Sequence, residues 1–373
     1  MRYLNLLLLV GISFLPLYMW SSGGLQASHF FLILYSSVFL WSRGIGYGKA
    51  DLFLLLLLTV EIVRESFSVF FFASIQTFMP AVHLLFCLII FNVFRRIFES
   101  EKILQIMIAG FIISVGIAVF GVLFIGYSLS IDEGGSRAIG TFNNPNQLGY
   151  FSVCIFSIAF LLNLDKKISN YILILLIVSS IFLCVASLSK AAMISIGLPL
   201  TFVVFYIFKG RGKFGIGLLL FGLLILSIWY FYSTGILEQY SFFERLKNIG
   251  SQDDDNLEER GYGAIFQASV VELFFGFGYA GTTSVVGHEV HSTVFSFLAG
   301  YGLIGVTLFV TFLYFWALKV WRTFHLSGLF MIVFPPLVYG IAHNGSRFTI
   351  FWILLALSFA VCSKRKLATR YKN

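Results

Sequence analysis

The stretch from Leu104 to Ser128, LQIMIAGFIISVGIAVFGVLFIGYS, contains no charged residue and is long enough to cross a lipid bilayer. A helix that spans the hydrocarbon core needs about 20 predominantly apolar residues. Comparable apolar runs recur from Leu4 to Cys362. Of the 373 residues, 59% are hydrophobic and only 11% are charged, and the mean hydropathy is +0.93. This balance excludes a soluble domain of this size and predicts a polytopic membrane protein.

Apolar runs of this kind predict about 12 transmembrane helices. They lie at roughly 4–20, 25–41, 51–70, 76–94, 104–128, 147–164, 170–189, 191–208, 214–233, 292–320, 326–342 and 347–362. The tenth is too long for one straight span, and we expect Gly300, Gly302 and Gly305 to break it into an interfacial piece and a membrane piece. The expected fold is an all-α integral membrane protein, with residues 1–373 forming a single polytopic membrane domain.

The Lys and Arg residues indicate the orientation, because cytoplasmic loops carry an excess of them. If the N-terminus is inside and the first helix is retained, most of the 25 Lys and Arg residues fall on the cytoplasmic side, and both termini are cytoplasmic. The formal net charge of +8 is therefore explained by topology, and no nucleic acid is expected as a partner. The exceptions, in predicted outer segments, are Arg64, Arg137, Lys190, Arg245, Lys247, Arg260 and Arg347.

One polar segment stands out against the short loops, at residues 234–291 between the predicted spans nine and ten. The predicted orientation places it on the outer side of the membrane, periplasmic or extracellular, as one large loop. It carries Arg260, His288 and His291. Long polar loops are unusual between membrane helices, since polar backbone belongs outside the hydrocarbon. We therefore expect this segment to carry catalytic residues.

A second outer segment runs from Ser136 to Gly149, SRAIGTFNNPNQLG, and precedes the sixth span. Asn144 followed by Pro145 predicts a capped helix start, whose free N–H groups and positive dipole end favour an anion. Arg137 lies close enough to share that anion, such as a lipid-linked phosphate. The alternative is a capped helix with an arginine that reaches the membrane surface. Lys190, in a short outer turn, has the same two interpretations.

The other polar residues also have either a functional or a structural interpretation. Histidine is the usual general base near neutral pH, and His288 and His291 would share a face of a helix. Arg260 could clamp a phosphate bidentately. His343 and Arg347 flank a tight outer turn, where they bind the same anion or only cap two helices. Glu61 is expected to form a structural pair with Arg64, one turn away.

A metal site is not expected. The acidic run at 253–255 is interpreted as a solvated loop, and no third His or Cys lies at a zinc-ligand spacing from His288 and His291. The four cysteines fall inside apolar runs and are interpreted as buried small hydrophobic residues.

Four motifs together resemble the O-antigen polymerase and O-antigen ligase superfamily of bacterial membrane glycosyltransferases. They are Arg137 with the GTFNNPNQLG run, Ser189-Lys190-Ala-Ala, Arg260 before a Phe-Gly-Phe-Gly stretch, and His288-Glu-Val-His291 before LAGYGLIG. The resemblance covers roughly residues 110 to 320. In two places the chain departs from the family: Lys190 stands where arginine is frequent, and Ser292 follows His291 where asparagine is frequent.

The resemblance implies a metal-independent, inverting glycosyltransferase without a cofactor, in the bacterial inner membrane, with its active site on the periplasmic side. The leading hypothesis is an O-antigen polymerase that transfers a growing glycan from undecaprenyl pyrophosphate onto a lipid-linked repeat unit. His291, or alternatively His288, would be the base. Arg137 and Arg260 would stabilise the departing pyrophosphate, together with Lys190, Asn144 and Arg347 as binding residues.

Three alternatives stay open. An O-antigen ligase would use the same donor but transfer the glycan to lipid A-core. A polysaccharide transporter or flippase would need polar residues within several spans, where only Glu61 and Arg64 stand out. A receptor or structural protein would leave the clustered outer Arg and His residues unexplained. The expected partners are undecaprenyl-pyrophosphate-linked oligosaccharides and membrane lipid, and a chain-length regulator protein is a further candidate.

Overall fold

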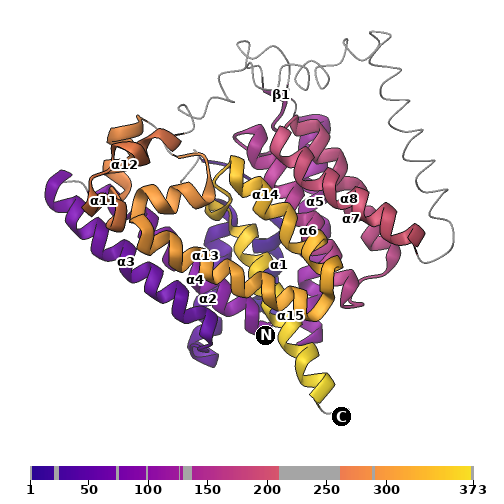
Figure 1. The fold of residues 1–373 in the computed structure, drawn as a ribbon. Coiled ribbons are helices and arrows are strands. Elements are labelled where there is room, and N and C mark those ends of the chain that lie inside the picture. The colour runs from indigo at the N-terminus through magenta and orange to yellow at the C-terminus, as the bar shows by residue number, and fades with distance from the viewer. Residues whose placement is uncertain are drawn as a thin grey trace, which may run out of the picture.

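The computed structural model describes residues 2–20, 25–72, 75–97, 100–125, 127–128, 137–209, 261–287 and 290–370, most of which are helical (Figure 1). Five helical segments in this part are long and apolar enough to cross a membrane by length and composition. They are Met79–Ile97, Glu101–Phe124, Pro145–Leu164, Asn170–Ser187 and Thr293–Ala342. The chain is therefore an all-α protein with several candidate membrane helices. The count of about 12 spans stays a prediction, and the ninth, at 214–233, lies outside the described residues.

The N-terminal part contains α1 (Arg2–Ser13), α2 (Ala27–Arg43), α3 (Lys49–Phe72), the 3₁₀ turn η1 (Ile75–Phe78), α4 (Met79–Ile97) and α5 (Glu101–Phe124). The first predicted span, 4–20, is wrong as a single helix, because α1 ends at Ser13. Pro16 explains the stop, since proline has no N–H to donate and disfavours a helical residue before it.

The middle part begins with a short antiparallel hairpin of β1 (Tyr127–Ser128) and β2 (Arg137–Ala138). It continues with α6 (Pro145–Leu164), α7 (Asn170–Ser187) and α8 (Lys190–Lys209). Helix α6 is buried along most of its length, because α5, α7, α8 and two C-terminal helices pack around it. Its first turn is thereby held in a fixed place at one end of the molecule.

The C-terminal part contains η5 (Tyr262–Gln267), α11 (Val270–Phe275), α12 (Gly278–Val286), α13 (Thr293–Gly328), a π-helical turn η6 (Leu329–Val333), α14 (Phe334–Ala342), η7 (Gly345–Arg347) and α15 (Thr349–Arg370). The predicted break in the tenth span is confirmed: Gly302 has φ 64° and ψ −163° inside α13. A second break at His325 was not predicted. Pro335 and Pro336 open α14 and cannot donate backbone N–H groups, which accounts for the irregular turn before it.

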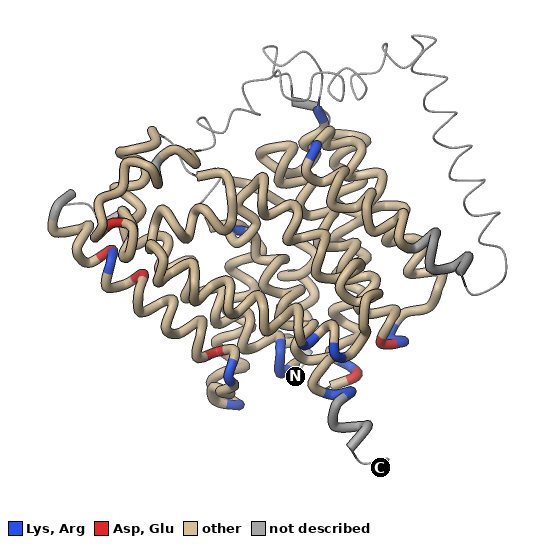
Figure 2. Tube along the Cα trace, viewed as in Figure 1, with Lys and Arg blue, Asp and Glu red and all other residues tan. Residues whose placement is uncertain are grey.

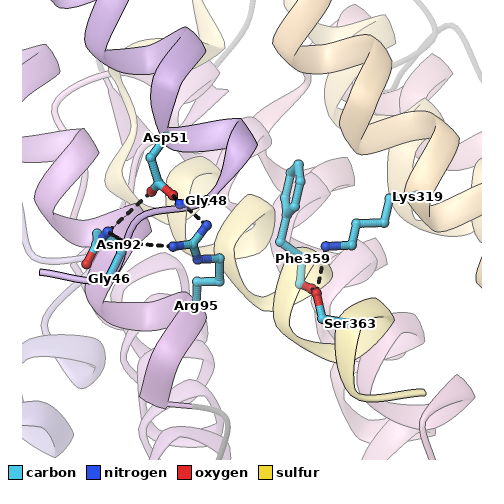
Figure 3. A network of polar contacts seen from close by, with 8 residues as sticks. All are labelled: Gly46, Gly48, Asp51, Asn92, Arg95, Lys319, Phe359 and Ser363. Carbon is cyan, nitrogen blue, oxygen red and sulfur yellow. Dashed lines mark hydrogen bonds and ion pairs between the residues drawn. The ribbon is translucent and has the colours of Figure 1, made fainter. Parts of the chain in front are cut away.

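Charge is unevenly distributed over the described residues. Figure 2 shows most Lys and Arg at the end where the two termini lie, and fewer at the opposite end. Figure 3 shows part of the basic end, where Arg95 forms an ion pair with Asp51 at 2.6 Å. Arg95 and Asn92 both donate to the carbonyl oxygen of Gly46, at 2.9 and 2.6 Å. The glycine-containing connection from α2 to α3 is therefore held by polar contacts within the protein.

Candidate functional site

The Arg137 guanidinium joins three elements at the end of the molecule opposite the termini. Its side chain is 5% exposed. Its Nε donates to the carbonyl oxygen of Ser187 at 3.2 Å, and Nη2 donates to Asn146 Oδ1 at 2.8 Å. The Ser187 carbonyl closes α7, and Asn146 lies in the first turn of α6. Arg137 thus lies between the end of one helix and the start of another, as the sequence predicted for the α6 side.

The predicted cap of α6 is confirmed. Asn144 has an extended backbone, and its side-chain oxygen accepts from the N–H of Asn146 at 2.7 Å, with Pro145 at the first helical position. Asn144 is exposed. The positive end of the 20-residue helix α6 therefore points toward the side that holds Arg137.

Lys190 comes to the same place through the turn between α7 and α8. It is the first residue of α8 and is half-buried. Leu188 adopts a left-handed conformation in this turn, and the Ser187 hydroxyl accepts from the N–H of Ser189 at 3.2 Å. Arg137 bonds Ser187 in the same turn, so two of the predicted anion-binding cations lie on either side of it.

A tyrosine extends the site from α6 to α14. The Tyr339 hydroxyl donates to the carbonyl oxygen of Asn146 at 2.6 Å. Its ring lies 4.5 Å from that of Tyr150 and 5.0 Å from that of His343, between centroids. Tyr339 was not predicted, because an apolar-looking residue within a predicted span gives no functional signal in the sequence.

The residues that follow His291 contact the end of α14 and the turn after it, next to Tyr339. Thr293 Oγ1 donates to the carbonyl oxygen of His343 at 3.1 Å and accepts from the N–H of Gly345 at 2.8 Å. The Ser292 hydroxyl donates to the carbonyl oxygen of Gly340 at 3.3 Å. His291 precedes these residues and is exposed. The Arg137, Lys190 and His291 regions are therefore joined by one continuous set of contacts.

Arg347 faces a different set of residues. It lies in the turn between α14 and α15, where electrostatic interactions link it to Tyr279 and Tyr18. The His83 side chain hydrogen-bonds to the Arg347 backbone. The surrounding protein lowers the pKa of Arg347, although its side chain retains exposed surface. Such a guanidinium stays charged.

Two glycine-rich motifs, far apart in the sequence, pack against each other. A Cβ on Gly276 would lie 2.2 Å from the carbonyl oxygen of Gly300, and a Cβ on Gly302 would lie 2.3 Å from the Phe274 backbone. The N–H of Phe277 donates to the carbonyl oxygen of Ala299 at 2.7 Å. The Phe-Gly-Phe-Gly stretch therefore docks onto the break in α13.

The hairpin of α11 and α12 is also tied to α3. Arg64 Nε donates to the carbonyl oxygen of Gly276 at 2.9 Å, and Glu65 Oε1 accepts from the N–H of Tyr279 at 2.8 Å. The predicted pair of Glu61 with Arg64 is therefore wrong. Glu61 is buried, and among the described residues its Oε2 has no hydrogen-bond partner. Arg64 points instead to the end of α11, a contact between segments far apart in the sequence.

Helix α11 begins with a capping box. The Ser269 N–H donates to Glu272 Oε2 at 2.8 Å, and Ser269 Oγ accepts from the Glu272 N–H at 3.3 Å. The Ser269 N–H lowers the pKa of the Glu272 carboxyl, so this carboxylate stays ionised near neutral pH.

Several predicted features lie outside the described residues, namely Arg260, His288, the acidic run at 253–255 and half of the polar segment 234–291. Within the described part, no group of three or more His, Cys, Asp or Glu residues is placed to hold a metal ion. All four cysteines are buried, as predicted. No protein-family model matches the sequence, and a search of curated proteins finds no match.

Proposed function

We propose that the protein is an O-antigen polymerase, a membrane glycosyltransferase that moves a growing glycan from undecaprenyl pyrophosphate onto a lipid-linked repeat unit. One observation supports the proposal most: a continuous set of contacts connects Arg137, the start of α6, the turn before Lys190 and the residues that follow His291. It combines cations, a positive helix end and an imidazole. A pyrophosphate leaving group and a hydroxyl nucleophile need these three features.

In the proposed reaction the sugar hydroxyl of the acceptor attacks the anomeric carbon of the donor glycan. His291 accepts the hydroxyl proton as the new C–O bond forms. The bond from the anomeric carbon to the pyrophosphate oxygen breaks, and its electron pair leaves with the pyrophosphate. Arg137 and Lys190 stabilise the charge that builds on that group, with Arg260 as a further predicted contact. Pyrophosphate is already a good leaving group, so the proposal includes no metal or general acid.

We further propose the bacterial inner membrane as the location, with the site on the periplasmic side and both termini in the cytoplasm. The gathering of Lys and Arg at the opposite end of the molecule supports this orientation (Figure 2). Arg347, an exposed cation in the turn between α14 and α15, would take a second anionic group. A polymerase handles two pyrophosphate-linked lipids, whereas a ligase handles one.

The test is the lipopolysaccharide pattern of a strain that lacks this gene. Core carrying a single repeat unit would identify a polymerase. Bare core with accumulated polymeric glycan on the lipid carrier would identify a ligase, and an unchanged pattern would remove the proposal and return attention to a transporter.

The same strain tests the base. We expect His291→Ala, at normal expression, to leave the repeat-unit ladder unrestored, because no group then accepts the hydroxyl proton. His325→Ala is a matched control, since His325 is exposed and lies in another part of α13. A normal ladder with His291→Ala would exclude this residue and direct the search to His288.

A further inference from the structure

The turn between α11 and α12 receives two opposite charges from consecutive residues of α3. Arg64 donates to the carbonyl oxygen of Gly276, which closes α11, and Glu65 accepts from the N–H of Tyr279, in the first turn of α12. A helix carries partial negative charge at its C-terminus and partial positive charge at its N-terminus. Each side chain therefore meets the helix end of opposite sign.

These two hydrogen bonds are partly buried. Glu65 is fully buried, and the N–H of Tyr279 donates to its Oε1, while among the described residues its Oε2 has no hydrogen-bond partner. Helices α11 and α12 contain only six and nine residues. Isolated helices of this length are unstable in water, so their order depends on tertiary contacts of this kind.

The two helices on either side of His291 are both in contact with this turn or with α3. Helix α12 ends at Val286, and α13 begins at Thr293, two residues after His291. Glu65 holds the start of α12. The hydrogen bond from Phe277 to Ala299 and the close approach of Gly276 to Gly300 hold α13.

We propose that Arg64 and Glu65 are positioning residues: they clamp the α11–α12 turn and thereby keep the His291 segment in place. This role rests on the proposed function for its effect on catalysis. The clamp itself is independent of that function, because it is a property of the two short helices. Neither residue touches the reacting atoms.

The kinetic test compares four variants with the wild-type protein in a reconstituted transfer assay. We expect Glu65→Ala and Arg64→Ala to lower kcat by up to about 100-fold with little change in KM, because a displaced base weakens the transition state and not substrate binding. Glu65→Gln keeps an acceptor oxygen for the Tyr279 N–H, and Arg64→Lys keeps a charged donor, so both should recover much of kcat. The pH dependence of the rate should keep its midpoint.

Ser66→Ala is the matched control, since Ser66 lies on the same helix with its side chain exposed. It should leave kcat unchanged. Loss of activity in Glu65→Gln equal to that in Glu65→Ala, or a shifted pH midpoint, would overturn the positioning role and make Glu65 a catalytic group.

A distance measurement separates the clamp from the transferase activity. Spin labels on Val285→Cys in α12 and Phe124→Cys in α5 are both at exposed positions, and all four native cysteines are buried. We expect a narrow distance distribution in the otherwise unchanged protein, and in combination with Glu65→Gln or Ser66→Ala. It should broaden with Glu65→Ala. A narrow distribution in Glu65→Ala would overturn the clamp, even if the protein proves to have no transferase activity.

Discussion

At the scale of single residues, the Arg137 side chain has a structural role and a proposed role in binding. It is buried and holds α6 to the end of α7, and it is also the proposed contact for a departing pyrophosphate. The planar guanidinium has five N–H donors, so it can serve both roles: one edge can donate to protein groups while other N–H groups donate to an anion. A lysine is a point charge and cannot reproduce this arrangement.

We therefore expect Arg137→Ala to lower the transfer rate by about 10²–10³-fold, the usual loss when one donor to a developing negative charge is removed. Arg137→Lys should fall between the wild type and Arg137→Ala, because it keeps the charge and loses the fork. Rates measured at saturating donor check this order. Arg43→Ala, an exposed arginine of α2, is the control for general loss of charge. Equal rates in Arg137→Lys and wild type would show that geometry is unimportant there.

At the scale of elements, the docking of two glycine motifs depends on the absence of side chains. Gly276 and Gly302 have φ of 76° and 64°, and each approaches backbone closely. Gly44 offers a comparison, because it has φ 66° but nothing within 4 Å of a Cβ. The three positions separate the effect of the left-handed backbone from the effect of close approach.

We expect Gly44→Ala to destabilise by about 1–2 kcal/mol, from the left-handed backbone alone. Gly276→Ala and Gly302→Ala should destabilise by about 1–3 kcal/mol more, because overlap with the facing backbone adds to that strain. Thermal unfolding in detergent, followed by tryptophan fluorescence, would measure the order. A Gly276→Ala protein as stable as Gly44→Ala would show that the hairpin does not pack against α13 as described.

At the scale of the whole molecule, the two ends differ in charge and in chemistry. The basic end holds ion pairs such as Arg95 with Asp51, and the other end holds the candidate site (Figure 2). If the site faces outward, Phe266→Cys, at a position 91% exposed near α11, should react with a membrane-impermeant maleimide in cells with a permeabilised outer membrane. Tyr171→Cys, 86% exposed at the start of α7, should react only after the inner membrane is opened. The reverse pattern would contradict the orientation.

Local features could be predicted from the sequence because their signals lie within a few residues of one another. The Asn144 cap with Pro145 and the break at Gly302 are confirmed for this reason. Long-range partners could not be predicted. An apolar membrane helix has no polar face to indicate which side packs inward. The partners of Arg64 and Tyr339 could therefore not be predicted. The sequence also provided no functional hypothesis for His83, which hydrogen-bonds to the Arg347 backbone.

The contact of Arg64 with Gly276 has a consequence for biosynthesis, because 212 residues separate the two in the chain. At about 5–20 residues per second, the ribosome completes the α11–α12 turn roughly 10–40 s after α3 has emerged. During that interval Arg64 and Glu65 are already part of the nascent chain, and their partners in the α11–α12 turn do not yet exist. If α3 spans the membrane as the sequence predicts, it must enter the bilayer before the α11–α12 turn can bond Arg64 and Glu65. The hydrogen-bond partners of Arg64 and Glu65 are thus synthesised long after α3 itself.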